Sequence, residues 1–168
     1  MGRLASVKGF DLLLEAWAKV ARKYPDWHLD IVGGGEERGK LERLITSLGL
    51  EGSASLEGVT PCVDNYYRRS SLFVLSSRLE PFGLVLIEAK SFGLPVVAYD
   101  CPFGPREVVR DGVDGILVEN GSVEGLAQAM MRMLQEEDLR RKYGAEALAD
   151  FKARWHVENV LDKWNNIL

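Results

Sequence analysis

Several residue types and patterns are scarce in this 168-residue chain, and each scarcity excludes a class of protein. Cysteine occurs only at Cys62 and Cys101, in unlike surroundings, which excludes a disulfide framework and favours a reducing compartment. No apolar run approaches the length of about 18 residues that a membrane-spanning helix needs, and the amino terminus carries no apolar signal segment. The net charge of −4 provides no basic excess for nucleic acid or anionic lipid. A cytoplasmic location is the resulting expectation.

What is present is the composition of an ordinary globular protein, with 46% hydrophobic and 27% charged residues. At this length one domain buries about 70% of the surface that its unfolded chain exposes. Short apolar runs alternate with helical patterns along the chain. We expect strands at residues 29–32, 55–56, 72–75, 95–99 and 115–118, and helices at residues 10–21, 41–48, 63–69, 83–92, 105–109, 123–134, 139–148 and 157–167.

Strands separated by helices predict right-handed crossovers, and therefore a parallel sheet with helices on both of its faces. The expected fold is a Rossmann-like, three-layer α/β/α domain over residues 1–168, with the helices of residues 139–168 packed against it. Ligands of such sheets bind in the crevice beyond the carboxyl ends of the strands. This pattern indicates a fold and leaves the function open.

The most informative segment follows the apolar run of residues 72–75 and is bracketed by Glu80 and Glu88. Gly83 lets the backbone approach a ligand closely, and the helix that opens near it presents free amides and a positive dipole end. Glu80 in the loop and Glu88 on the helix therefore flank an anion site. We expect this arrangement to suit a nucleotide-sugar, which has phosphates at its centre and hydroxyls at both ends.

Further motifs occur in one order with this segment. They are Gly2-Arg3-Leu4, Lys8-Gly9-Phe10, the loop of residues 32–38, and, after Glu88, the runs of residues 89–97 and 100–107. The ordered set resembles the carboxyl-terminal, donor-binding half of a retaining GT-B glycosyltransferase of the GT4 family, also called group 1. The resemblance covers essentially the whole chain, and its most specific part is the spacing between Glu80 and Glu88.

The resemblance implies a role for each matching residue. Arg3 and Lys8 would hold the donor diphosphate, and their positive charge would stabilise the leaving group as the glycosidic bond breaks. Glu80 would accept hydrogen bonds from hydroxyls of the transferred sugar. Glu88 would bind the ribose hydroxyls through charge-assisted hydrogen bonds.

The same resemblance places the rest of the donor. The amides of Gly83 and Leu84 would contact sugar or phosphate oxygens next to Phe82, and the base would pack at Gly58 and Val59. The only small molecule implied is the donor itself, a nucleotide-diphospho-sugar, with a UDP-sugar favoured. The family needs no metal, and this sequence agrees in lacking both an Asp-x-Asp triplet and a cluster of histidine and cysteine.

Two departures from the family stand out. Complete enzymes have a second, amino-terminal domain that carries most acceptor contacts, so that domain would be a missing partner and this chain alone would transfer little. Family members also have a central strand immediately before the segment that matches Gly2, and this chain lacks almost all of it. We expect that another chain fills the gap, that the sheet closes differently, or that residues near Arg3 are poorly ordered.

The leading hypothesis is therefore the donor-binding half of a retaining, metal-independent hexosyltransferase for polysaccharide or another glycoconjugate. Two alternatives stay open at this point. One is a nucleotide-binding or interaction module without chemistry of its own, and the other is a generic α/β scaffold. For the complete enzyme, the sequence also leaves open peripheral contact with the inner face of a membrane.

Overall fold

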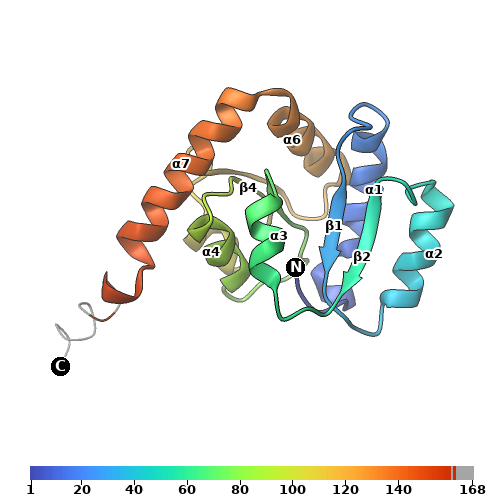
Figure 1. The fold of residues 1–168 in the computed structure, drawn as a ribbon, viewed down its shortest axis with the longest axis horizontal. Helices are drawn as coiled ribbons and strands as arrows, with labels where there is room; N and C mark the ends of the chain where they lie inside the picture. Colours follow the sequence, from blue (N-terminus) through green and yellow to red (C-terminus); the bar gives the residue numbers. More distant parts are fainter. Residues whose placement is uncertain (160, 162–168) are drawn as a thin grey trace.

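The computed structural model describes residues 1–159 and 161, and these residues alternate strands with helices as the sequence predicts (Figure 1). The helix predicted at residues 157–167 lies for the most part outside the described residues. The elements are η1 (Ser6–Lys8), α1 (Phe10–Ala21), β1 (Leu29–Val32), α2 (Arg38–Leu48), β2 (Ala54–Gly58), α3 (Val63–Arg69), β3 (Phe73–Leu75), α4 (Leu84–Ser91), β4 (Val96–Asp100), α5 (Gly104–Val108), β5 (Gly115–Glu119), α6 (Val123–Gln135) and α7 (Glu137–Arg154).

Local sequence accounts for several element ends. Helix α2 stops at Gly49, which adopts the left-handed conformation at φ 67° that a side chain would disfavour. Helix α6 begins after Ser122, whose hydroxyl accepts a hydrogen bond from the Gly125 amide over 3.1 Å. Helix α1 turns Leu14 and Trp17 into the core, so its apolar stripe faces the sheet. No helix within the described part of the chain combines the length and apolar composition that crossing a bilayer requires.

Helix α7 runs past the predicted end at Leu148 and continues to Arg154. The reason is a tertiary contact, because the Asp150 carboxylate near its carboxyl end binds the buried ammonium of Lys90 on α4 over 2.5 Å. Earlier in α7, Gly144 packs so closely on the loop after α4 that an added Cβ would lie 2.4 Å from a backbone oxygen there. These contacts hold α7 along α4.

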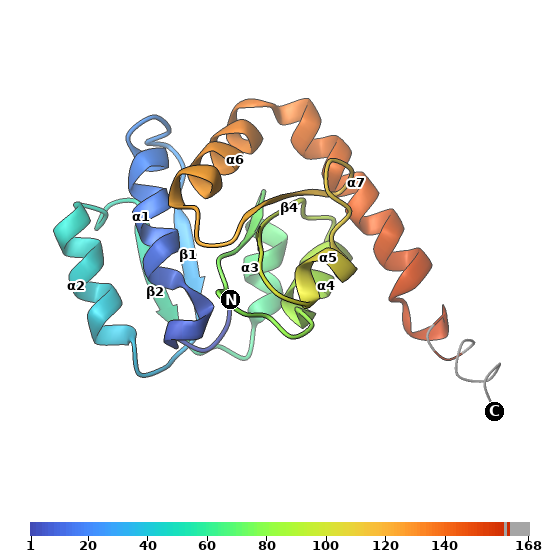
Figure 2. The same ribbon diagram turned by 180° about the vertical axis from the view of Figure 1, so that it is seen from behind.

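The strands are parallel, as predicted, but those of the described residues form two separate sheets with the orders β1-β2 and β3-β4-β5. Helices α1 and α6 lie on one side of the strands, and α3 lies on the other side (Figures 1 and 2). The amino terminus lies between β1 and α3 in both views. The three-layer, Rossmann-like α/β arrangement is confirmed, with a break between β1 and β3.

A cavity of about 470 Å³ occupies this break. Its walls include Ile31 of β1 and Phe73 of β3, with Trp17 of α1 and Met130 of α6 on one side. The resemblance predicts a central strand at this position of the sheet. The described residues do not close the gap by another strand order, so the expectation that the sheet would close differently is wrong.

The edge of β1 that faces the cavity presents backbone groups that can pair with a further parallel strand. Leu29 and Gly33 donate their amide protons toward β2, so the backbone groups of Asp30 and Val32 point toward the cavity. Gly2 already donates its amide to the Val32 oxygen over 2.9 Å, at the carboxyl end of β1. A strand that ended at Gly2 would therefore run parallel to β1 and β3.

Fusing about five alternating valine and isoleucine residues ahead of Met1 is expected to raise the unfolding free energy by about 2 kcal/mol, or Tm by about 4–8 °C. The reason is that the added side chains fill the cavity and their amides complete both ladders. Differential scanning calorimetry measures the change. A control fusion with proline at alternate positions lacks the amide donors toward one of the two neighbouring strands and is expected to leave Tm unchanged. Equal gains from both fusions would contradict strand pairing.

Candidate functional site

The candidate site lies at the carboxyl ends of the strands, where several loops and the first nine residues meet. Three backbone hydrogen bonds join these loops in a row. Gly2 donates to the end of β1 over 2.9 Å, and Gly33 donates to Gly58 at the end of β2 over 2.8 Å. Beyond β3, the Gly104 amide donates to the backbone carbonyl oxygen of Glu80 over 2.8 Å. The row brings the predicted segments into one surface.

Lys8 and Glu80 form the centre of this surface. The Lys8 ammonium lies 2.6 Å from Glu80 Oε2, and the Ser77 hydroxyl donates to the same oxygen over 3.1 Å. Glu80 is only 7% exposed, whereas Lys8 is half-buried. Within the described residues, both side-chain hydrogen bonds to Glu80 go to Oε2. Its other oxygen, Oε1, can still accept a hydrogen bond.

A tight contact between η1 and the loop after β3 positions Lys8. Gly9 has a φ of 63°, and a Cβ there would lie 2.1 Å from the Ser76 carbonyl oxygen, so this approach requires glycine. The Ser76 hydroxyl donates to the Lys8 carbonyl oxygen over 3.0 Å. Arg78 adds a two-bond clamp onto Asp11 at 2.9 and 2.8 Å. The Arg78 hydrogen bond holds the pKa of Asp11 below its usual value.

The amino-terminal turn of α4 lies next to Glu80. Gly83 caps this helix at a φ of 88°, and a Cβ on Gly83 would lie 3.5 Å from Glu80 Cγ. Leu84 is 65% exposed, and Phe82 is also exposed, with its ring edge against Trp155 at 5.7 Å between centroids. Solvent therefore reaches the start of α4, whose free amides favour an anion.

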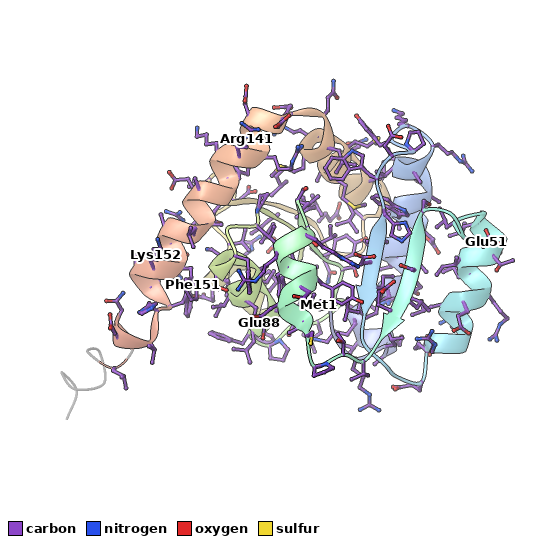
Figure 3. All side chains as sticks on the ribbon, viewed as in Figure 1. Met1, Glu51, Glu88, Arg141, Phe151 and Lys152 are labelled. Carbon is purple, nitrogen blue, oxygen red and sulfur yellow. The ribbon has the colours of Figure 1, made fainter. Side chains whose placement is uncertain are left out.

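Glu88 lies further along α4, on the solvent side, and accepts a hydrogen bond from the Tyr67 hydroxyl over 2.7 Å. Glu88 and Met1 both lie beside α3 (Figure 3). The pKa of the Met1 amino group is lowered to about 6, mainly by burial and also by the Lys8 charge, while the Glu88 charge acts in the opposite direction. Glu88 is thus held from α3 by Tyr67, whereas Lys8 is paired with Glu80.

Two predicted groups lie away from this centre. The Arg3 guanidinium is 74% exposed and donates to Glu36 over 3.1 Å, so it is not part of the Lys8–Glu80 contact. Gly58 and Val59 lie at the other end of the row of loops, where Val59 is exposed and a Cβ on Gly34 would lie 2.9 Å from its side chain. The structure thus brings Lys8 and Glu80 together and leaves Arg3 outside their contact.

The structure also reveals partners for which the sequence carried no assigned role. Ser77 shares Glu80 Oε2 with Lys8, and its place directly after a buried strand was the available signal. Tyr67 binds Glu88 from a different helix, and no local pattern pointed to this contact. Both glutamates are therefore held by neutral hydroxyl donors as well as by their place in the fold.

Comparison with known proteins identifies the family. Residues 1–150 match the family model described as glycosyl transferases group 1. The amylovoran biosynthesis glycosyltransferase AmsD of Erwinia amylovora is 38% identical over 168 residues, which is 100% of this chain and 46% of that protein. Anabaena Alr3699/HepE in complex with UDP has a TM-score of 0.92 at 27% identity, over 99% of this chain and 46% of that one.

A third comparison is with an isolated domain. The C-terminal domain of the group 1 family glycosyl transferase LpcC from Francisella tularensis has a TM-score of 0.86 at 25% identity, over 94% of this chain and 84% of that one. The chain spans about half the length of the curated relatives AmsD and an uncharacterized glycosyltransferase of Haemophilus influenzae. The chain belongs to the group 1 glycosyltransferases and corresponds to their carboxyl-terminal domain.

Proposed function

We propose that this domain binds the nucleotide-diphospho-sugar donor of a retaining, metal-independent hexosyltransferase of the GT-B type that builds polysaccharide or another glycoconjugate. The observation that carries this proposal is the Lys8 ammonium, 2.6 Å from Glu80, beside the open amino-terminal turn of α4. A cation and a helix start at one place favour a diphosphate. In support, HepE has been solved with UDP and with UDP-glucose, and the pneumococcal transferase GtfA with UDP and GlcNAc.

In this proposal the two glutamates bind the two hydroxyl-rich ends of the donor. Glu80 accepts from the transferred sugar, and Glu88 accepts from the ribose. The geometry suits both roles, because Glu80 is held at Oε2 by Lys8, and Glu88 is held at Oε2 by Tyr67. Each carboxylate keeps lone pairs for a ligand hydroxyl, and hydrogen bonds to a charged acceptor are stronger than neutral ones.

The diphosphate lies between these ends, against Lys8 and the amides of Gly83 and Leu84. Arg3 completes the charge neutralisation by leaving Glu36, since an exposed ion pair of this kind contributes little that would hold it there. Phe82 borders the same turn of α4. These groups supply the positive charge that a metal ion supplies in other transferases, which is the basis for proposing a metal-independent site.

The base is proposed to pack at Gly58 and Val59, at the end of β2. Uracil is favoured because the solved relatives HepE and GtfA contain UDP. The exposed position of Val59 offers an apolar surface for a planar ring.

Transfer is proposed to proceed with retention at the anomeric carbon. The bond to the diphosphate breaks while Lys8 and Arg3 hold the departing group, the acceptor hydroxyl attacks the anomeric carbon from the same face, and its proton passes to the departing phosphate oxygen. In this proposal Glu80 positions the sugar and acts electrostatically, without becoming a covalent nucleophile. The acceptor contacts come from a companion amino-terminal domain, so the present domain alone transfers little. We place the complete enzyme in the cytoplasm, in peripheral contact with the inner face of the membrane.

A nucleotide panel tests the donor site. Titrating the chain with UDP, GDP and ADP in the presence of EDTA, followed by NMR chemical shifts, is expected to show saturable binding that is tightest for UDP. Glu88→Ala is expected to weaken UDP binding about tenfold, because a charge-assisted hydrogen bond to ribose is lost. Glu51→Ala removes an exposed glutamate from the turn before β2 and serves as the matched control.

The outcome separates the alternatives. No binding at millimolar nucleotide would leave only an α/β scaffold, and binding that Glu88→Ala does not change would remove the proposed ribose contact. Mixing the domain with a companion amino-terminal domain and assaying sugar transfer then distinguishes an enzyme half from a nucleotide-binding module without chemistry.

A further inference from the structure

Tyr67 is the side chain that links α3 to the Glu88 carboxylate on α4. Its hydroxyl donates to Glu88 Oε2 over 2.7 Å, although the two residues are 21 positions apart in the sequence. Tyr67 is 2% exposed, whereas Glu88 lies on the solvent side of its helix. The buried tyrosine therefore donates its hydroxyl proton to a carboxylate that is exposed to solvent. A ligand can reach the same carboxylate from the solvent side.

The ring of Tyr67 packs against two aromatic neighbours. Phe92 stacks on it with centroids 5.2 Å apart and an angle of 12° between the planes, and Phe73 packs at 5.9 Å and 38°. A tyrosine has few rotatable bonds, and these contacts restrict them further. The hydroxyl consequently has a nearly constant position relative to α4.

The hydrogen bond from Tyr67 restricts the Glu88 side chain, which would otherwise populate several rotamers. Ordering a free glutamate costs up to about 1.5–2 kcal/mol in rotamer entropy. Burial raises the pKa of Tyr67, and the hydrogen bond to Glu88 raises it further, so Tyr67 stays a proton donor at every ordinary pH. The carboxylate accepts that proton at one lone pair of Oε2 and keeps the remaining acceptor sites for a ligand.

We infer that Tyr67 is a positioning residue for the donor site, holding the Glu88 carboxylate in the orientation that accepts the vicinal hydroxyls of ribose. The inference rests on the proposed function of this site. Its consequence is that the domain distinguishes ribose from 2′-deoxyribose through Glu88, and that Tyr67 sets how well it does so.

The test compares UDP with 2′-deoxyuridine diphosphate on the 168-residue chain and on Tyr67→Phe. The unchanged chain is expected to prefer UDP about tenfold, because one charge-assisted hydrogen bond is missing with the deoxynucleotide. Tyr67→Phe is expected to weaken UDP binding about fivefold or more and to leave the deoxynucleotide within about twofold. The preference for ribose would then largely disappear.

The neighbouring residue provides a matched control. Tyr66 donates to Glu57 over 2.7 Å with the same chemistry, and Tyr66→Phe is expected to leave both affinities unchanged. If Tyr67→Phe lowered the affinities for UDP and for the deoxynucleotide equally, the inference would be overturned and Tyr67 would have a structural role only. An unaltered ribose preference would also overturn it and leave the donor site intact, whereas no UDP binding by the unchanged chain would overturn both.

Discussion

Replacing Glu80 by glutamine in an enzyme that contains both domains is expected to lower kcat/KM about 100-fold, since two charge-assisted hydrogen bonds of about 1.5 kcal/mol each are weakened. Glutamine keeps the size of the side chain but removes the charge that pairs with Lys8 at 2.6 Å. It also offers a neutral acceptor to the sugar hydroxyl. Steady-state transfer kinetics measure the loss.

The proposed role of Glu80 predicts that the substitution weakens the contacts to the transferred sugar and leaves the affinity for the nucleotide nearly unchanged. UDP binding to Glu80→Gln is expected to stay within about threefold of the unchanged enzyme, because Lys8 is retained and none of the proposed nucleotide contacts is made by Glu80 itself. Glu51→Gln, in the exposed turn before β2, provides the matched control. Turnover by Glu80→Gln within twofold of the unchanged enzyme would contradict the assignment.

Replacing Lys90 by methionine is expected to destabilise the domain by about 3–5 kcal/mol, or to lower Tm by about 6–20 °C. Lys90 is fully buried and donates to Asp150, Asp114 and the Val108 carbonyl oxygen at 2.5, 3.1 and 2.7 Å. Its removal leaves two buried carboxylates short of a cation. Thermal and urea denaturation measure the change, and limited proteolysis reports whether α7 separates from α4.

The control for this prediction is an exposed ion pair. Lys19 lies 3.0 Å from Glu124, with both side chains about half exposed, and Lys19→Met is expected to change stability by less than about 1 kcal/mol. An equal loss of stability in Lys90→Met and Lys19→Met would contradict a special role for the buried contacts of Lys90 with Asp114 and Asp150.

The pH dependence of Lys90→Met gives a second check. Although burial alone would raise the pKa of Asp150, the hydrogen bond and charge of Lys90 lower it overall. A carboxyl with a lowered folded-state pKa stabilises the fold above its unfolded pKa of about 3.9 and loses that contribution as the pH falls. The stability gap between the unchanged chain and Lys90→Met is therefore expected to narrow below about pH 4.

Much of the fold followed from local patterns. The apolar run at residues 29–32 became β1, and the helical pattern at residues 41–48 became most of α2, which ends at Gly49. Such features depend on neighbouring residues, whose periodicity and turn preferences act over a few positions. The end of α7 was predicted wrongly, because the contact between Asp150 and Lys90 joins positions far apart in the chain.

The candidate site shows the same division. The order of its motifs was readable from the chain, and the family that they resemble is confirmed. The partners of each side chain were not readable, since Lys8 and Glu80 are 72 positions apart and meet through tertiary contacts such as the close approach at Gly9. Arg3, expected beside Lys8, instead binds Glu36.

The amino-acid sequence by itself determined the alternation of strands and helices, the family, and the positions of the two glutamates around the start of one helix. Only the tertiary structure decided that the strands of residues 1–159 divide into two sheets around a cavity, that Tyr67 holds Glu88, and that Lys90 is buried between two aspartates. The physical reason is distance along the chain. Local preferences act between neighbours, whereas hydrogen bonds and ion pairs between layers depend on how whole elements pack.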